Sequence, residues 1–245
     1  MNILVLGATS DIARAFAGQL AQRGDHWLLA GRDLASLEEA AIDLGIRTGA
    51  KVSSCVFDVE EHDRAPAFVG EVLSTLGSID GVVVAFGYLG DQERGQREME
   101  HAARIIDVNF TSAVAVLEPF AAYLEERGSG WIMGLSSVAG VRGRRSNYLY
   151  GAAKGAFTLY LEGLAHRLAA RGVRVKIAKL GFVSTKMTRG MEMPGWAVAT
   201  PEEAARGLVW LLRSPFQSAF IPWRWWVVMT LIRALPATLF NRTKL

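Results

Sequence analysis

Tyr150 and Lys154 form the pair of residues with the clearest chemical potential in this sequence. Their four-residue spacing places both side chains on one face of a helix, about one turn apart. A phenol has an ordinary pKa of about 10, and a nearby ammonium lowers it by favouring the phenolate. The pair therefore predicts a proton donor suited to carbonyl reduction near neutral pH. Ser136 and Ser137 follow an apolar run at 131–135, which would present a hydroxyl to substrate at the carboxyl edge of a sheet.

The segment after the first apolar run has the form of a phosphate-binding turn. Residues 3–6 read as a strand, and Gly-Ala-Thr-Ser-Asp-Ile-Ala at 7–13 leads into a helical pattern. Such a turn presents backbone amides and a helix N-terminus to a pyrophosphate. Asp11 and Ala13 stand where glycine is most frequent in this motif, so an ordinary turn with Asp11 as a helix cap is the alternative. The candidate cofactor contacts in this turn are Gly7, Thr9, Ser10, Asp11 and Ile12.

Residues after the second and third apolar runs bear on the choice of dinucleotide. Arg32 stands where an arginine favours the 2′-phosphate of NADP and an acidic residue favours the ribose hydroxyls of NAD. The adjacent Asp33 suits NAD or, equally, the N-cap of the next helix. Asp58 and Val59 follow the third run, and Asp58 can accept the adenine amino group or serve only as a turn residue. NADP is therefore favoured, and NAD stays open.

The elements that must position these residues alternate along the chain. Apolar runs predict buried strands at 3–6, 27–30, 52–57, 82–85, 131–135 and 173–178. Helical spacing of apolar residues predicts helices at 13–23, 34–44, 65–76, 98–126 and 151–171. This alternation predicts an α/β fold with a doubly wound, Rossmann-type parallel sheet in a single domain, rather than a barrel of eight units. We expect a reductase domain at 1–222 and a helical, Trp- and Arg-rich extension at 223–245.

The residues around Tyr150 make the catalytic pattern much more specific. Trp-Ile-Met-Gly-Leu-Ser-Ser-Val-Ala-Gly occupies 131–140, Tyr150 stands thirteen residues after Ser137, and Lys154 stands four further on. In these features the chain resembles the short-chain dehydrogenase/reductase family. The helical Asn109 matches a fourth position of the family pattern. The resemblance implies a catalytic set of Asn109, Ser137, Tyr150 and Lys154, with no metal.

The resemblance also implies a role for each member of this set. Tyr150 protonates the carbonyl oxygen, and Ser137 hydrogen-bonds the same oxygen. Lys154 lowers the pKa of the tyrosine and holds the nicotinamide ribose, together with Tyr150, while Asn109 anchors the lysine through water. Hydride comes from the bound NADPH or NADH.

Two segments depart from the family pattern, and both lie beside the expected cofactor. The usual Asn-Asn-Ala-Gly after the fourth strand reads Val-Ala-Phe-Gly at 84–87, and the usual Pro-Gly after the sixth reads Leu180-Gly181. The backbone of 85–87 can still contact the adenine ribose, and Thr185 matches the position that reaches the nicotinamide amide. The contacts implied here are Ala85, Phe86, Gly87, Gly181, Val183 and Thr185.

Composition excludes disorder, and charge is distributed unevenly. Of the 245 residues 51% are hydrophobic and 21% charged, which is typical of a globular protein. The net charge of +3 conceals 21 basic and 24 acidic residues at 1–203 against six basic and no acidic residues at 204–245, a segment that also holds four of the seven tryptophans. The single Cys55 excludes an intramolecular disulfide and reads as a small buried side chain. Without a secretory signal pattern, we expect a cytoplasmic protein.

Two features bear on the substrate. Arg142, Arg144 and Arg145 lie between Ser137 and Tyr150, where they can bind a phosphate or, equally, form a solvated loop or a subunit contact. The segment 223–235 is too short and too interrupted by arginine to span a bilayer. It suits the headgroup region of a membrane, at its inner face, or it docks on its own domain or a second subunit.

Four segments, at 7–13, 85–91, 144–150 and the tail, resemble one branch of the family, the decaprenylphosphoryl-2-keto-ribose reductases. This resemblance implies reduction of a 2-keto sugar on a polyprenyl phosphate, which feeds cell-wall arabinan. A reductase of a soluble ketone, sugar or acyl substrate is the alternative, and a non-catalytic dinucleotide-sensing or interaction protein is the second alternative. The family resemblance implies a homodimer or homotetramer. We expect no nucleic-acid partner, because the body is acidic and no recognition module precedes the basic tail.

Overall fold

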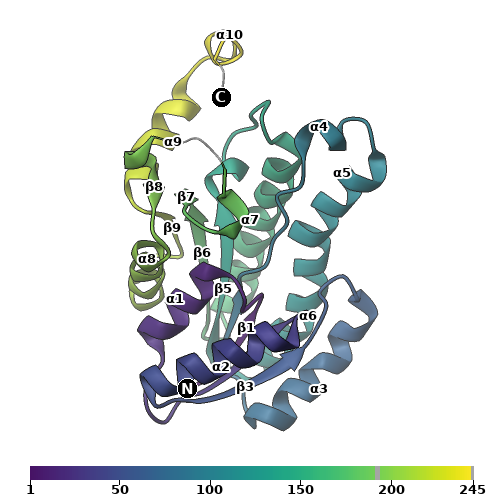
Figure 1. Ribbon diagram of the computed structural model, residues 1–245, viewed down its shortest axis with the longest axis vertical. Coiled ribbons are helices and arrows are strands. Elements are labelled where there is room, and N and C mark those ends of the chain that lie inside the picture. The colour runs from purple at the N-terminus through teal and green to yellow at the C-terminus, as the bar shows by residue number, and fades with distance from the viewer. Residues whose placement is uncertain (191–193, 244–245) are drawn as a thin grey trace.

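The chain folds around a seven-stranded parallel sheet with the order β3-β2-β1-β4-β5-β6-β9 (Figure 1). The computed structural model describes residues 1–190 and 194–243. The strands are β1 (Asn2–Leu6), β2 (His26–Gly31), β3 (Lys51–Val56), β4 (Gly81–Val84), β5 (Gly130–Ser137), β6 (Val173–Leu180) and β9 (Ser218–Ile221). A separate pair is formed by β7 (Phe182–Val183) and β8 (Val198–Ala199). Strand order reverses direction between β1 and β4, and the predicted doubly wound fold is confirmed.

Helices cover both faces of the sheet. One face packs against α1 (Asp11–Leu20), α2 (Leu34–Thr48) and α8 (Pro201–Arg213), and the other against α3 (Ala65–Leu76), α6 (Ser112–Arg127) and α7 (Tyr148–Ala169). In β1, Ile3 and Val5 join the first core, whereas Leu4 and Leu6 join the second. Burial on both faces explains why the strands read as continuous apolar runs.

The helix predicted at 98–126 is continuous, but its centre is irregular. It consists of α5 (Met99–Ile106), a π-helical turn at Asp107–Thr111 and then α6. Among the described residues, the stretch Met99–Arg127 is the one helix apolar and long enough to cross a membrane. Half of its apolar 18-residue window is buried inside the fold, as expected for a core helix. The remaining short elements are α4 (Gln92–Gly95) and the 3-10 turns His62–Arg64, Val138–Gly140, Lys186–Thr188 and Gly195–Ala197.

Two local predictions need correction. The strand β9 has no counterpart among the predicted strands, because its four residues lie at the sheet edge and three of them remain partly or fully exposed. Cys55 is only partly buried, because β3 is the opposite edge strand. Burial still raises the pKa of its thiol to about 11, so the residue is protonated at neutral pH.

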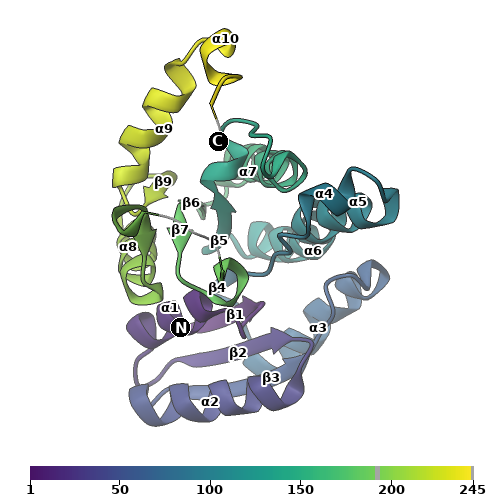
Figure 2. The same ribbon diagram turned by 45° about the horizontal axis from the view of Figure 1, so that its top comes forward.

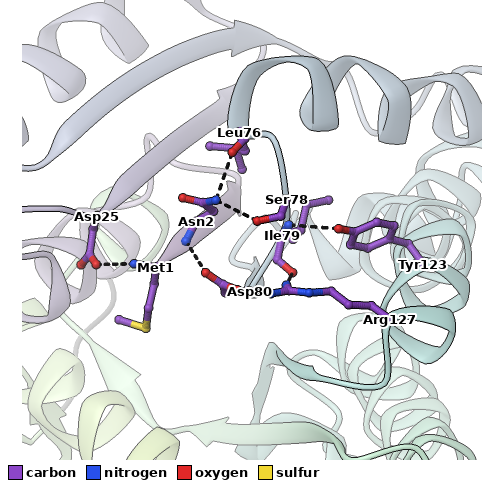
Figure 3. A network of polar contacts seen from close by, with 9 residues as sticks. All are labelled: Met1, Asn2, Asp25, Leu76, Ser78, Ile79, Asp80, Tyr123 and Arg127. Atoms are coloured by element: carbon purple, nitrogen blue, oxygen red, sulfur yellow. Dashed lines mark hydrogen bonds and ion pairs between the residues drawn. The ribbon is translucent and has the colours of Figure 1, made fainter.

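A polar network holds together the amino ends of β1 and β4, at the sheet edge opposite the strands' carboxyl ends (Figure 3). The Asn2 backbone N–H donates to Asp80 at 2.7 Å, and Asp80 pairs with Arg127 of α6 at 2.6 Å. Arg127 also donates to the carbonyl of Ile79. The N-terminal ammonium of Met1 pairs with Asp25 at 2.6 Å. These contacts fix the strand starts to α6, remote from the candidate site.

The tail docks on the body of the protein through α9 (Arg224–Ala234), which α10 (Ala237–Phe240) follows (Figures 1 and 2). Its buried side chains, Trp225, Met229 and Ile232, form a small core with Val138 and Ala197. These two partners belong to the segments that follow β5 and β7. The inner face of the tail helix therefore supports the loops at the carboxyl edge of the sheet.

Candidate active site

A cavity opens at the carboxyl ends of β1, β4 and β5, where the strand order reverses. This is the position at which doubly wound folds bind ligands. Ser137, Tyr150 and Lys154 line it, and so do all the predicted cofactor contacts except Asp58: Gly7, Thr9, Ser10, Asp11, Ile12, Arg32, Val59, Ala85, Phe86, Gly87, Gly181, Val183 and Thr185. The fold thus brings residues from seven separate segments of the sequence into one site.

The turn between β1 and α1 fits a pyrophosphate. Gly7 has a φ of +77°, and a Cβ there would lie 2.6 Å from the backbone nitrogen of Phe86, so this position requires glycine. Within the described chain the Ser10 side chain does not cap α1. Asp11 and Ile12 line the cavity, and N–H groups in the first turn of a helix have no partner within the helix. Amide donors at a helix N-terminus are suited to phosphate oxygens. The Asp11 carboxylate does not cap the helix and instead accepts from the backbone N–H of Lys186 at 3.0 Å.

The far end of the cavity, beside β2 and β3, holds a charged cluster. Glu60 pairs with Arg104 at 3.0 Å and with Arg32 at 3.4 Å. Arg32 therefore lies where a cofactor phosphate is expected, but it shares a carboxylate with a second arginine. Asp58 lies outside the cavity lining, and its carboxylate accepts from the backbone N–H of Glu60 at 3.0 Å. This hydrogen bond is the turn role that the alternative interpretation gave Asp58, and its contact with the adenine amino group stays a prediction. The N-cap position of α2 is occupied by Asp33, as the alternative interpretation predicted.

Two elements carry three of the four predicted catalytic residues. Ser137 ends β5, and its hydroxyl accepts from the Ala139 backbone N–H at 3.1 Å. Tyr150 lies in the first turn of α7, and Lys154 follows one turn later. The Lys154 ammonium lies 6.0 Å from the centre of the Tyr150 ring and donates to the carbonyl of Leu135 at 3.2 Å. The hydroxyl, the phenol and the ammonium therefore border the same end of the cavity.

Burial controls the protonation of the phenol and the ammonium. It raises the pKa of Tyr150 to about 12, with the Ser137 hydroxyl acting in the opposite direction, because loss of hydration disfavours the phenolate. It also lowers the pKa of Lys154 to about 8. The prediction that Lys154 brings the tyrosine pKa below its ordinary value is therefore wrong for this structure. Tyr150 is nevertheless protonated at neutral pH, as a proton donor must be.

Asn109 lies in the π-helical turn, buried behind the cavity wall. Its amide donates to the carbonyls of Tyr88 and Ile105 at 2.6 and 2.8 Å, and its oxygen accepts from the Tyr88 backbone N–H at 3.2 Å. A Cβ on Gly87 would lie 2.9 Å from that oxygen and 3.4 Å from the Lys154 ammonium. Because glycine has no side chain, Asn109 and Lys154 can both lie close to the segment that follows β4. A π-helical turn inside an α-helix is frequently found at a functional site.

The three arginines between Ser137 and Tyr150 have different environments. Arg142 donates to the carbonyls of Ile232, Arg233 and Leu235 at the end of α9, and it stacks on Phe240 at 4.0 Å. Arg145 is exposed and lies outside the cavity lining. Arg144 is buried and lines the cavity. The sequence prediction of a three-arginine phosphate site is therefore reduced to one candidate.

Several lining residues were not among the predicted site residues. They include Glu60, Tyr88, Arg104 and Asn147, in addition to apolar residues. Glu60 and Arg104 meet only because the loop after β3 lies beside α5. Asn147 could have been suspected, since it stands three residues before Tyr150 at the N-cap of the same helix.

Comparison with known proteins gives a family match over most of the chain. A family model described as short chain dehydrogenase matches residues 1–193. An uncharacterized oxidoreductase of Mycobacterium tuberculosis strain H37Rv is 33% identical over 240 residues, which cover 98% of this chain and 96% of the relative. An uncharacterized oxidoreductase of Streptomyces coelicolor is 35% identical over 243 residues, with coverages of 98% and 95%. The 3-oxoacyl-acyl-carrier-protein reductase of Chlamydia muridarum is 29% identical over 228 residues, with coverages of 89% and 91%.

Solved structures share the same architecture at lower sequence identity. NAD+-bound xylitol dehydrogenase has a TM-score of 0.77 and 24% identity, covering 87% of this chain and 92% of that protein. An actinorhodin polyketide ketoreductase variant with NADPH also has a TM-score of 0.77, at 22% identity and coverages of 89% and 94%. These likenesses show the common fold.

Proposed function

This chain belongs to the short-chain dehydrogenase/reductase family, and from that premise we propose that it reduces a ketone through Asn109, Ser137, Tyr150 and Lys154. It is an NAD(P)-dependent oxidoreductase that acts on CH–OH groups. The observation that carries the ketone assignment is the convergence of Ser137, Tyr150 and Lys154 on a cavity that also contains the uncapped start of α1.

The protein groups have separate tasks in this mechanism. Tyr150, protonated at neutral pH, donates its proton to the carbonyl oxygen as charge develops there. Ser137 donates a hydrogen bond to the same oxygen and so orients the carbonyl. Lys154 holds the nicotinamide ribose, and Asn109 fixes the backbone at Tyr88, which borders the site. The bound dinucleotide supplies the hydride.

We propose NADPH as the preferred reductant. The support is Arg32, whose side chain follows β2 and is largely exposed at the end of the cavity. A guanidinium there can bind a 2′-phosphate in addition to Glu60. Because the Glu60 carboxylate competes with a 2′-phosphate for Arg32, activity with NADH must be measured alongside activity with NADPH.

We propose a 2-keto sugar carried on a polyprenyl phosphate as substrate, in line with the resemblance of the four sequence segments described above. An excess of positive charge in the cavity supports an anionic substrate, since its charged lining residues are Arg32, Arg104, Arg144, Lys154 and Lys186 against Asp11 and Glu60. The outer side of the tail helix supports a lipid-borne one: Trp223, Trp226, Val227 and Leu231 are exposed at helical spacing. On this proposal the enzyme is cytoplasmic and contacts the inner face of the membrane peripherally.

A soluble acyl ketone is the second candidate. The Chlamydia muridarum relative, named for 3-oxoacyl reduction, supports it. In that case the exposed tail residues would serve subunit contact, and we propose a homodimer or homotetramer under either substrate. Exposed Trp210 and Phe216, 5.7 Å apart beside β9, support such an assembly.

The function is tested by Tyr150→Phe with Tyr148→Phe as the matched control. Tyr148 lies in the same helical turn, is 43% exposed and does not line the cavity. Oxidation of NADPH and of NADH is followed with a panel of keto sugars and 3-oxoacyl esters. Tyr150→Phe should lose at least about 100-fold in kcat, the contribution typical of a general acid, and should retain cofactor binding by fluorescence titration. Wild-type activity in the Tyr150→Phe protein would contradict the mechanism.

A further inference from the structure

Arg144 is a buried cation beside the catalytic residues without a compensating anion among residues 1–190 and 194–243. It is 8% exposed and lines the active-site cavity. Its Nε has no hydrogen-bond partner among the described residues, and Arg144 takes part in none of the ion pairs found among them. Buried guanidinium groups are nearly always paired, because an unpaired buried charge costs several kcal/mol of folding free energy. Such an arrangement indicates a group that meets its partner on ligand binding.

A second unsatisfied atom lies on the same turn. The Oδ1 of Asn147 is buried without a donor among the described residues, and Asn147 also lines the cavity. The Asn147 backbone N–H donates to the Arg144 carbonyl at 3.2 Å, so one turn carries both residues. This turn leads directly into α7, whose first turn contains Tyr150. The cavity lining near Tyr150 therefore contains one unpartnered donor, the Arg144 Nε, and one unpartnered acceptor, the Asn147 Oδ1.

The other cations of this region are already engaged or exposed. Arg142 is held by the end of α9, and Arg145 faces solvent. Arg32 and Arg104 share Glu60. Arg144 is therefore the buried guanidinium that the described residues leave available for an anion. The hydrogen bonds of Arg142 to the end of α9 hold the loop that carries Arg144 against the tail helix.

We propose that Arg144 and Asn147 form a substrate subsite for a phosphate group, in which Arg144 binds the phosphate oxygens and Asn147 accepts from a neighbouring sugar hydroxyl. The substrate class rests on the proposed function, but the anion site itself does not. A planar guanidinium binds two phosphate oxygens at once, which both anchors and orients the ligand. The phosphate can belong to a lipid diester or to a soluble sugar phosphate.

The first experiment measures binding without turnover. The enzyme is saturated with NADP+, which occupies the pyrophosphate region, and is titrated calorimetrically with inorganic phosphate and with dimethylallyl phosphate. Arg144→Gln should weaken both by about 10- to 100-fold, the value of a charge-assisted hydrogen bond, while Arg145→Gln, the exposed control on the same loop, should change neither. Tighter binding of dimethylallyl phosphate than of inorganic phosphate indicates a lipid source, and equal binding indicates a soluble one.

The second experiment uses a ketopentose with and without its phosphate. Arg144→Gln should lower kcat/KM for the phosphorylated ketone by a similar factor and leave that for the neutral ketone within about twofold. Arg144→Lys keeps the positive charge and should recover part of the lost kcat/KM for the phosphorylated ketone. The same comparison can be made with this variant if Arg144→Gln folds poorly. Weaker NADP+ binding by Arg144→Gln, equal loss on both ketones, or no phosphate binding by the wild type would each overturn the proposal. Phosphate binding without any ketone reduction would instead overturn the proposed function alone.

Discussion

Replacement of Lys154 by methionine should stabilise the folded protein at neutral pH while abolishing activity. Lys154 is 4% exposed, and burial lowers the pKa of its ammonium from 10.5 to about 8. At 1.36 kcal/mol per pKa unit, this corresponds to a loss of about 3 kcal/mol of stability when the ammonium is charged. The hydrogen bond from Lys154 to the Leu135 carbonyl stabilises the folded protein by about 1 kcal/mol and offsets part of this loss. Lys154→Met should therefore raise the free energy of unfolding by about 2 kcal/mol at pH 7.

The pH dependence gives the sign of this effect. Below about pH 8 the lysine is charged in both the folded and the unfolded chain, so the full loss applies. Between about pH 8 and 10.5 the folded protein has released the proton that the unfolded chain still holds, so wild-type stability rises with pH relative to the variant. Above about pH 10.5 the lysine is neutral in both states, so burial of its charge no longer lowers the stability of the wild type.

Urea denaturation at pH 7 and at pH 9.5 measures both effects. The matched control is Lys51→Met, which replaces an exposed side chain at the start of β3. Its free energy of unfolding should differ from that of the wild type by the same amount at both pH values. The reasoning is refuted if Lys154→Met is less stable than the wild type at pH 7, or if its advantage is the same at both pH values. Reductase activity of Lys154→Met, measured in parallel, should be lost.

Two further predictions concern the tail. Gly181→Ala would overlap the buried indole of Trp225, so unfolding experiments should show a loss of about 1–3 kcal/mol, the range for overpacked cores; unchanged stability would contradict the observed fit. Full-length protein should float with anionic vesicles, and a variant with serine at Trp223, Trp226 and Leu231 should stay in the bottom fraction. Leu159→Ser, equally exposed but on α7, is the control and should still float; a wild type that stays at the bottom contradicts the membrane contact.

Much of the fold followed from local pattern. The six predicted strands are present, because a parallel sheet covered on both faces produces continuous apolar runs. The helix at 65–76 has the predicted bounds, and that at 98–126 differs by one residue at each end. The apolar pattern did not predict β9, because its pairing with β6 depends on the return of the chain through α8 rather than on its own four residues.

The site was less predictable than the fold. The spacing of Ser137, Tyr150 and Lys154 identified the residues that converge, since their elements adjoin in any doubly wound sheet. The direction of the Tyr150 pKa was predicted wrongly, because spacing reveals the neighbouring charge but not the loss of hydration around the phenol. Asp58 stays a predicted cofactor contact, and its hydrogen bond from the backbone N–H of Glu60 is a feature that sequence position alone did not reveal.

The sequence by itself determined the fold class, the family and the chemical identity of the reacting groups, because periodicity and short-range spacing are local properties. The tertiary structure decided which residues have partners. Three arginines in four positions look equivalent in the sequence, yet Arg142 holds the tail helix, Arg145 faces solvent and Arg144 is buried in the cavity. Likewise, one tail presents Trp225 to the core and Trp226 to solvent. Partners come from segments distant along the chain, so their identity is set only when the whole chain has folded.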